Sequence, residues 1–366
     1  MPSRAVTGPV RNSRVATRRL LVTGFAALMV ATGLAGLSPS RSEAATPSTY
    51  VALGDSFASG DGISPALGES GACARSLAAY PELVSRAAHF TNFDFIACSG
   101  ATTSQVSAQV TRSHSALASA ELVTMDAGGN DLSFSGLLRT CIGLLTPSST
   151  AIRYFPGVSG TTACDNAVRS AAALLGAKVV PMSGAIAASA GVLKTPLRTP
   201  SPLERRLLTL YRAILRSMGT TGTAGGRGQL VVVQYPMLLA DSSGSACRLT
   251  SSPISLPVSS PVNGLYPGFS ASATRALIVL NQLLNRETAA VVVSLRDSGV
   301  TRLSSVAASS FAPIDCARGT SNDLYGIEVS PASNGLEGAS LHPTSAGQLK
   351  LAAAVLARWS VARNAR

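Results

Sequence analysis

Four residues in this sequence stand where they could carry out nucleophilic chemistry together. Ser56, Gly100 and Asn130 each follow a short apolar run, and His342 directly precedes the last helical stretch. A serine hydroxyl becomes an effective nucleophile when a neighbouring base such as histidine removes its proton. A glycine lets the backbone N–H approach a ligand closely, and an amide side chain adds a further donor. A lone serine after a strand is usually a turn or N-cap residue, so the prediction depends on all four residues together.

The elements that must position these residues alternate along the chain. Apolar runs rich in β-branched residues predict buried strands of a parallel sheet, and apolar residues spaced three and four apart predict helices between them. The predicted strands are 50–53, 93–97, 122–125 and 230–234, and the predicted helices are 204–218, 272–298 and 344–363. This alternation predicts an α/β fold, a three-layer α/β/α sandwich with a mainly parallel central sheet. Because ligands bind at the carboxyl ends of such strands, the four residues are expected to meet there.

Two segments do not follow the alternation. Residues 132–202 are rich in Ala, Gly and Ser, which predicts a helical insertion or a lid. Residues 241–268 are rich in Ser and Pro, which predicts a long loop. Loops of this length usually shape a binding site, and a plain spacer is the alternative.

All six cysteines lie beyond the N-terminal 44 residues. An even number of cysteines in an exported chain, without any C-x-x-C pair, predicts three disulfides rather than a metal site. Among the fifteen formal connectivities we predict sequential pairing: Cys73 with Cys98, Cys141 with Cys164, and Cys247 with Cys316.

Residues 1–44 read as a cleaved signal peptide. An arginine-rich start is followed by the apolar run 20–37 and by a small-residue exit at 42–44. The length of the apolar run leaves a membrane anchor as the alternative, and the paired arginines at 18–19 leave both Sec and Tat export open. Residues 45–366 are then expected to form a single domain.

The charge pattern narrows the classes of partner. The formal net charge is +12, and the leader carries six arginines and one glutamate, which leaves +7. The remaining basic residues are scattered without runs or interleaved aromatics, which argues against nucleic-acid binding, whereas anionic lipid or wall surfaces fit an exported basic protein. The chain has no HExxH, P-loop or GxGxxG motif, so no metal or other cofactor is predicted. It also lacks the G-x-S-x-G elbow of the α/β-hydrolase fold.

Four blocks in order carry a resemblance to a known family. Gly54-Asp55-Ser56, then Gly100, then Gly128-Gly129-Asn130-Asp131, and finally His342-Pro343 resemble the conserved blocks of the SGNH or GDSL-type hydrolases, especially the secreted bacterial lipases and esterases. The resemblance implies the flavodoxin-like fold of SGNH hydrolases, with Ser56 as nucleophile and His342 as general base. It also implies an oxyanion hole formed by the backbone N–H groups of Ser56 and Gly100 and the side-chain amide of Asn130.

One position departs from the common pattern of that family. Many members have an Asp three residues before the histidine, whereas this chain has Ala339. Some secreted members that lack the acid use a main-chain carbonyl instead, so the resemblance implies that the Ala339 carbonyl orients His342. Glu337 and the distant Asp315 are the alternatives.

Other polar residues near these motifs are expected to be structural. His89 and His114 lie outside any motif and are expected at the surface or at helix ends. Asp55 and Asp131 flank the reactive blocks and are expected to accept hydrogen bonds that fix their turns.

Together these observations predict a secreted serine esterase or lipase that hydrolyses acylglycerol or fatty-acyl esters. Phospholipase and polysaccharide O-acetyl esterase activities are the alternatives within the enzymes, and a non-catalytic secreted wall- or glycan-binding protein is the alternative of another class. We expect a monomer that acts on a small-molecule or lipid ester, without nucleic acid, cofactor or stable membrane anchor.

Overall fold

The computed structural model describes most of the chain beyond residue 47. The described residues are 48–68, 71–146, 152–153, 161–177, 181–182, 185–186, 199–219, 228–240, 245–253, 263–327 and 339–364. The predicted signal peptide and Glu337 therefore lie outside the described residues.

A five-stranded parallel sheet forms the centre of the fold, in the order β11-β8-β3-β1-β2. Its strands are β1 (Thr49–Ala52), β2 (Asn92–Phe95), β3 (Ala120–Met125), β8 (Gln229–Val233) and β11 (Leu303–Val306). Every residue of β1 and β8 is buried, whereas the edge strand β2 is half-exposed. Near-continuous apolar runs are typical of parallel strands covered on both faces, which is how the sequence identified four of the five.

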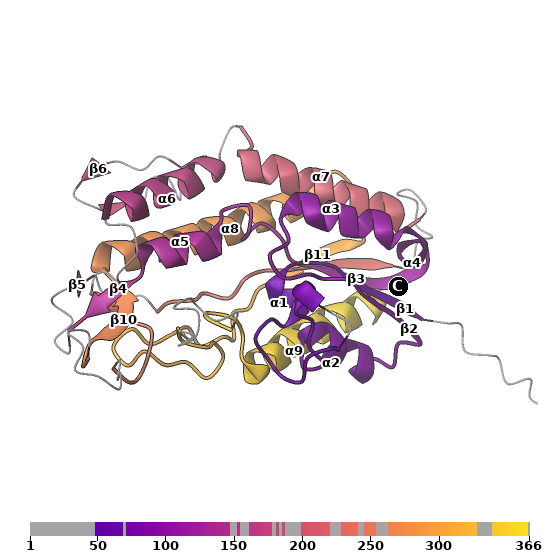
Figure 1. Cartoon of the computed structure of the whole chain (residues 1–366). Helices are drawn as coiled ribbons and strands as arrows, with labels where there is room; N and C mark the ends of the chain where they lie inside the picture. The colour runs from indigo at the N-terminus through magenta and orange to yellow at the C-terminus, as the bar shows by residue number, and fades with distance from the viewer. Residues whose placement is uncertain are drawn as a thin grey trace, which may run out of the picture. The chain divides into compact units, whose positions relative to one another are not determined.

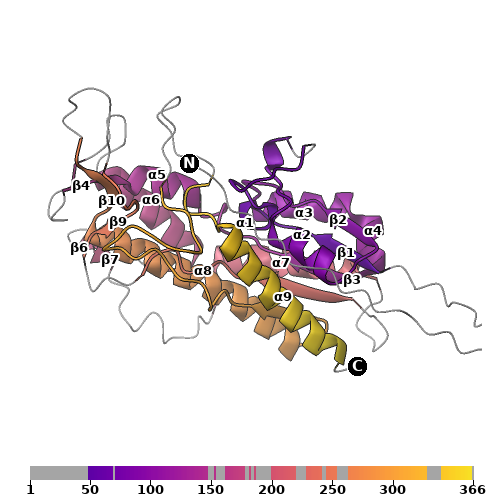
Figure 2. The ribbon, with the colours of Figure 1, turned by 90° about the horizontal axis from the view of Figure 1, so that it is seen from below.

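Helices cover both faces of this sheet, which confirms the predicted three-layer α/β/α sandwich. Figure 1 shows α3, α7 and α8 on one side and α2 and α9 on the other, and Figure 2 views the side that carries α9. The bounds are α1 (Ser56–Ser59), α2 (Tyr80–Ala87), α3 (Thr103–Arg112), α4 (His114–Ser119), α7 (Pro202–Ser217), α8 (Ala271–Asp297) and α9 (Ser345–Asn364), with a 3₁₀ turn at Gly71–Cys73. The predicted helices 204–218, 272–298 and 344–363 correspond to α7, α8 and α9.

Helix α8 is long and apolar enough, by length and composition, to cross a membrane. Its most apolar window has a mean hydropathy of 1.3, and 56% of that window is buried in the protein. Buried leucines and valines recur along one face of α8 and pack in the core. These contacts are typical of the core helix of a globular protein.

A second, antiparallel sheet corrects the prediction that residues 241–268 form only a loop. Its order is β5-β4-β10-β9, with β4 (Gly143–Leu145), β5 (Ile152–Arg153), β9 (Cys247–Arg248) and β10 (Tyr266–Phe269). These strands are too short to show a period of two, and Pro267 and Gly268 interrupt the pattern of β10. Gly268 is needed because an added Cβ would lie 2.4 Å from the Cys247 carbonyl oxygen of the adjacent strand.

The segment 132–202 contains helices, as predicted. These are α5 (Phe134–Cys141) and α6 (Thr161–Leu174), and the two-stranded pair β6 (Pro181–Met182) and β7 (Ala185–Ile186) follows them. The segment also contributes the strands β4 and β5 to the antiparallel sheet, which the prediction of a helical insertion did not include. Within 132–202 the described residues are 132–146, 152–153, 161–177, 181–182, 185–186 and 199–202.

The three disulfides join the pairs that the sequence order suggested. Cys73 is bonded to Cys98, Cys141 to Cys164, and Cys247 to Cys316. The second links α5 to α6, and the third fastens β9 to the segment after β11. The connection between α5 and α6 and the one between β9 and Cys316 are therefore each closed by a disulfide.

Candidate active site

The turn after β1 fixes the position of Ser56. Gly54 has φ +136°, and a Cβ there would lie 2.2 Å from Oδ1 of Asp126, so no other residue fits without displacing that carboxyl. Asp55 is the N-cap of α1, and its Oδ1 accepts the backbone N–H of Phe57 at 3.1 Å. Ser56 is the first residue of α1, where backbone N–H groups lack acceptors within the helix.

The loop before α9 fixes the position of His342. The His342 backbone is paired on both sides: its N–H donates to the Ala339 carbonyl and its carbonyl accepts the Tyr325 N–H, each at 2.9 Å. Leu341 has φ +61°, a left-handed conformation that costs an ordinary residue roughly 1–2 kcal/mol. Its side chain is buried among the residues that line the pocket. Packing of Leu341 therefore maintains a strained turn immediately before the histidine.

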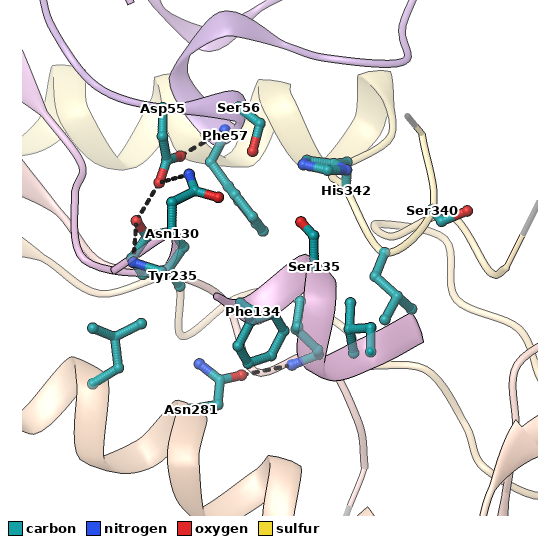
Figure 3. Close-up of a pocket in the computed structure, with 15 residues that line it drawn as sticks. Asp55, Ser56, Phe57, Asn130, Phe134, Ser135, Tyr235, Asn281, Ser340 and His342 are labelled. Atoms are coloured by element: carbon teal, nitrogen blue, oxygen red, sulfur yellow. Dashed lines mark hydrogen bonds between the residues drawn. The ribbon is translucent and has the colours of Figure 1, made fainter. Parts of the chain in front are cut away.

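Ser56, Asn130 and His342 line one pocket. In Figure 3 an edge of the His342 ring faces the Ser56 side chain. The Phe57 ring lies between the His342 and Tyr235 rings, with centroid distances of 5.2 and 5.0 Å. The pocket occupies about 510 Å³ including its mouth, and its remaining lining residues are Asp55, Gly129, Phe134, Ser135, Leu138, Leu238, Asn281, Leu284, Ser340 and Leu341.

Gly100 is not among the residues that line this pocket. It is exposed in a turn with φ +78°, and an added Cβ would meet no atom within 4 Å, so its backbone conformation rather than lack of space favours glycine. The turn is held beside the Ser56 loop because the Cys98 N–H donates to the Gly54 carbonyl at 3.0 Å and Cys98 is bonded to Cys73.

Asn130 is held by hydrogen bonds of its own side chain. Its Nδ2 donates to Asp55 Oδ2 at 3.3 Å and to the Ala101 carbonyl at 3.2 Å. Because both N–H groups have protein acceptors, one of these bonds must be exchanged before Asn130 can donate to a developing oxyanion.

A buried polar cluster lies behind the serine, and two of its members were missed by the sequence analysis. The Asp55 N–H donates to Asp126 Oδ1 at 2.7 Å, and the Tyr235 hydroxyl donates to Asp55 Oδ2 at 2.5 Å. Tyr235 in turn accepts the Gly129 N–H at 3.1 Å. The sequence feature that could have indicated both residues is their place just beyond a strand end. Asp126 follows β3 directly, and Tyr235 is the second residue after β8.

Burial raises the pKa values of both carboxyls in this cluster. The pKa of Asp126 lies well above its ordinary value of 3.8, first because of burial and then because of the nearby Asp55 charge. Burial also raises the pKa of Asp55, but hydrogen bonds from Tyr235 and from the Phe57 N–H oppose the rise. Two adjacent buried carboxyls cannot both ionise cheaply, and the stronger rise in pKa at Asp126 favours the proton on that carboxyl.

Residues expected to be structural have structural partners. Asp131 accepts the Thr103 N–H and hydroxyl at 2.8 and 2.7 Å and pairs with Arg206 at 3.0 Å. His89 follows the end of α2 and His114 begins α4, and both are exposed.

The structure describes two of the three residues considered for orienting His342. Ala339 is buried, and Gly62 packs so closely that a Cβ there would lie 2.3 Å from the Ala339 Cα. Asp315 does not line the pocket; it accepts the Ala317 N–H at 2.9 Å and lies 3.6 Å from Arg318. Within the described ranges, no group of three or more His, Cys, Asp or Glu side chains is placed to hold a metal ion.

The state of Asp126 gives a prediction about stability. A carboxyl whose pKa is raised by folding costs stability above the unfolded pKa, and the cost grows as pH rises from there toward the folded pKa. Asp126→Asn keeps an oxygen for the Asp55 N–H and removes this ionisation, so the free energy of unfolding at pH 7 should increase. The gain should shrink as pH falls toward 3.8. Denaturant unfolding across this pH range measures it.

Asp94→Asn on the half-exposed edge strand β2 is the matched control for the loss of one carboxyl, and it should change the free energy of unfolding at pH 7 little. A loss of stability in Asp126→Asn at pH 7 would show that Asp126 is ionised in the folded protein.

Comparison with known proteins identifies the family. The model of the GDSL-like Lipase/Acylhydrolase family matches residues 52–224. Lipase 1 of Streptomyces coelicolor is 40% identical over 130 residues, which are 34% of this chain and 47% of that protein. A lipase of Streptomyces rimosus is 39% identical over 127 residues, which are 34% of this chain and 46% of that protein. The chain thus spans about half the length of the curated relatives it matches.

Two crystal structures share the fold over most of the chain. Phospholipase A1 from Streptomyces albidoflavus NA297 aligns with a TM-score of 0.55 and 23% identity, covering 86% of this chain and 99% of that one. The extracellular lipase from Streptomyces rimosus aligns with a TM-score of 0.54 and 25% identity, covering 85% and 99%. Together with the matched motifs and the parallel sheet that presents them, these likenesses show that the chain belongs to the GDSL-like lipase/acylhydrolase family.

Proposed function

We propose that this protein is a secreted serine esterase or lipase that hydrolyses acylglycerol or fatty-acyl esters. The observation that carries the proposal is that Ser56 and His342 line the same pocket, whose other lining residues are largely apolar. Membership of a family of lipases and acylhydrolases supports the same reaction.

The reaction would pass through an acyl-enzyme. His342 takes the Ser56 proton as the hydroxyl attacks the ester carbonyl, and it returns the proton to the departing alcohol. A water molecule then attacks the acyl-enzyme with His342 again as base. Backbone N–H groups of Ser56 and Gly100 and the Asn130 amide are the proposed oxyanion donors, which stabilise the charge on the carbonyl oxygen.

Asp55 supports this cycle electrostatically. Among the described residues that line the pocket it is the one with an acidic side chain, and its charge attracts a protonated His342. Since residue 339 is alanine, a buried anion on the other side of the pocket supplies part of the stabilisation that an adjacent acid would give the imidazolium.

The apolar lining favours an acyl chain over a sugar. Phe134, Leu138, Leu238, Leu284 and Leu341 form most of the inner wall. Filling such a wall with methylene groups is worth about 0.8 kcal/mol for each buried group. A polysaccharide acetyl esterase would instead need polar groups along the cleft. We therefore favour fatty-acyl esters as the substrate.

The cellular setting follows from the N-terminus and the disulfides. We infer that residues 1–44 are removed on export by the Sec or Tat route and that residues 45–366 act as one monomeric domain. Three disulfides support an extracellular location, because such bonds persist in oxidising compartments.

Covalent labelling tests the nucleophile. A fluorophosphonate should form an adduct on Ser56, located by peptide mass spectrometry, because the reagent needs a serine activated by a base. Ser56→Ala should abolish both the adduct and ester hydrolysis. Ser135 lines the same pocket, so Ser135→Ala is the matched control and should still be labelled. A folded wild-type protein without an adduct on Ser56 would favour the non-catalytic binding protein.

The role of Asn130 can be separated from substrate binding. Asn130→Ala should lower kcat by about 10²–10³, with a smaller effect on KM, because an oxyanion donor acts mainly in the transition state. Asn166, exposed on α6, gives the control variant Asn166→Ala, which should keep wild-type kinetics. An effect of Asn130→Ala confined to KM would assign this residue to ground-state binding.

The group that orients His342 is also open to a direct test. If the Ala339 main-chain carbonyl orients the imidazole, Ala339→Gly should retain most of kcat/KM because the carbonyl remains. Glu337→Gln should then lose less than about tenfold, since loss of an orienting acid costs far more. The values of kcat/KM for both variants, measured by steady-state kinetics, test this. A loss of more than about tenfold in Glu337→Gln would show that Glu337 orients the imidazole.

A further inference from the structure

We propose that Asn281 makes the inner cavity selective for esters with a hydrogen-bond acceptor, such as an ether, keto or hydroxyl oxygen, in the part of the substrate that fills it. This inference rests on the proposed ester hydrolysis and adds a substrate class to it. Asn281 is not part of the reactive motifs, and its place in the middle of α8 gave no sign of a role at the site.

Asn281 belongs to a helix face that forms the cavity floor. Leu277, Asn281 and Leu284 lie four and three residues apart on α8, and all three border the cavities beside Ser56. A second, smaller hollow, about 210 Å³ including the open solvent at its mouth, shares Phe134, Leu138, Leu238, Asn281 and Leu341 with the first and continues toward Leu239, Leu277 and Ile278. Asn281 therefore borders both hollows, next to their apolar side chains, and its exposed fraction is only 3%.

The orientation of its amide is determined by its one hydrogen bond. Asn281 Oδ1 accepts the Leu238 backbone N–H at 3.1 Å. Because a backbone N–H can only donate, the oxygen must face Leu238 and the nitrogen must face the other way, as Figure 3 shows. Among the described residues no acceptor is placed for that nitrogen.

Asn285, one turn further along α8, shows what a purely structural asparagine looks like here. Its Oδ1 accepts the Tyr235 N–H at 3.1 Å, and its Nδ2 donates to the Tyr235 carbonyl at 2.7 Å. Both ends of that amide are satisfied by one residue of the chain. Asn281 accepts a backbone N–H through Oδ1 in the same way, but its Nδ2 has no acceptor among the described residues. Its two N–H groups can therefore donate to a molecule that occupies the cavity.

The consequence for substrate choice follows from desolvation. Water in the cavity can accept from the Asn281 amide, and a substrate that fills the cavity displaces that water. An all-methylene chain leaves the buried N–H groups without acceptors, whereas a chain with a suitably placed oxygen restores a bond. A site with a buried polar group discriminates against analogues that lack its partner. The oxygenated ester is therefore the better substrate at equal length.

A positional series of esters tests the proposal. One arm uses nitrophenyl esters of equal chain length in which an ether oxygen replaces one methylene at successive positions of the acyl chain. The other arm uses butyrate esters of alcohols with an ether oxygen at successive positions. For each pair, the ratio of kcat/KM for the oxygenated ester to that for the methylene ester is measured, so that general damage to a variant cancels.

In the wild-type protein, one position in one arm should give a ratio about five- to tenfold above those of the other positions. Asn281→Leu should reduce that ratio to the level of the other positions. Gln282 is exposed on the next position of α8, so Gln282→Leu is the matched control and should keep the preference. The arm that shows the preference tells whether the cavity holds the acyl chain or the alcohol.

Two results would overturn the proposal. One is a flat series in both arms with the wild-type protein, which needs no variant to fold. The other is a preference that persists in Asn281→Leu. If no ester is hydrolysed and Ser56 takes no fluorophosphonate, the proposed function itself fails, whereas hydrolysis of the methylene esters without a preference overturns this inference alone.

Discussion

The rest of the site depends on one hydrogen bond between the ends of two neighbouring strands, in which the Asp55 N–H donates to Asp126 Oδ1 at 2.7 Å. The bond brings the Asp126 carboxyl so close to Gly54 that only glycine, at φ +136°, fits. The resulting turn directs the Asp55 side chain back onto the Phe57 N–H and makes Ser56 the first residue of α1. The direction of the proposed nucleophile is thus a consequence of a buried carboxyl behind it.

The same arrangement makes the Asp55 carboxylate the junction of three strand ends. Tyr235, after β8, donates to it at 2.5 Å, and Asn130, after β3, donates at 3.3 Å. A proton on Asp126 allows this carboxylate to remain charged in a buried place, because two adjacent charges of the same sign would be costly there. A proton on Asp126 and a charge on Asp55 therefore depend on one another.

The sequence predicted the residues whose place at an element end could be recognised, and it missed those whose role depends on three-dimensional neighbours. Ser56, Asn130 and His342 follow or precede elements with clear apolar patterns, so their convergence could be expected from a parallel sheet. Asp126 and Tyr235 also follow strands, but only the packing of β1 against β3 and β8 shows that they share a carboxylate. Likewise β11, with two serines in four residues, and the two-residue β9 lack an apolar pattern, and only pairing with β8 and β10 defines them.

The proposed chemistry and the proposed substrate preference depend on different parts of the fold. The turn after β1 and the loop before α9 supply the proposed reactive groups, and their backbone requirements are tight, as at Gly54, where few substitutions can be accommodated. Much of the cavity wall comes from α5 and α8, where a side chain can change size or polarity while the helix backbone stays in place. Asn281 needs only its bond to Leu238 to keep its position, so the polarity of the cavity can change independently of the serine and histidine. Differences in ester preference among proteins with this architecture are therefore expected on those two helix faces rather than at the sheet edge.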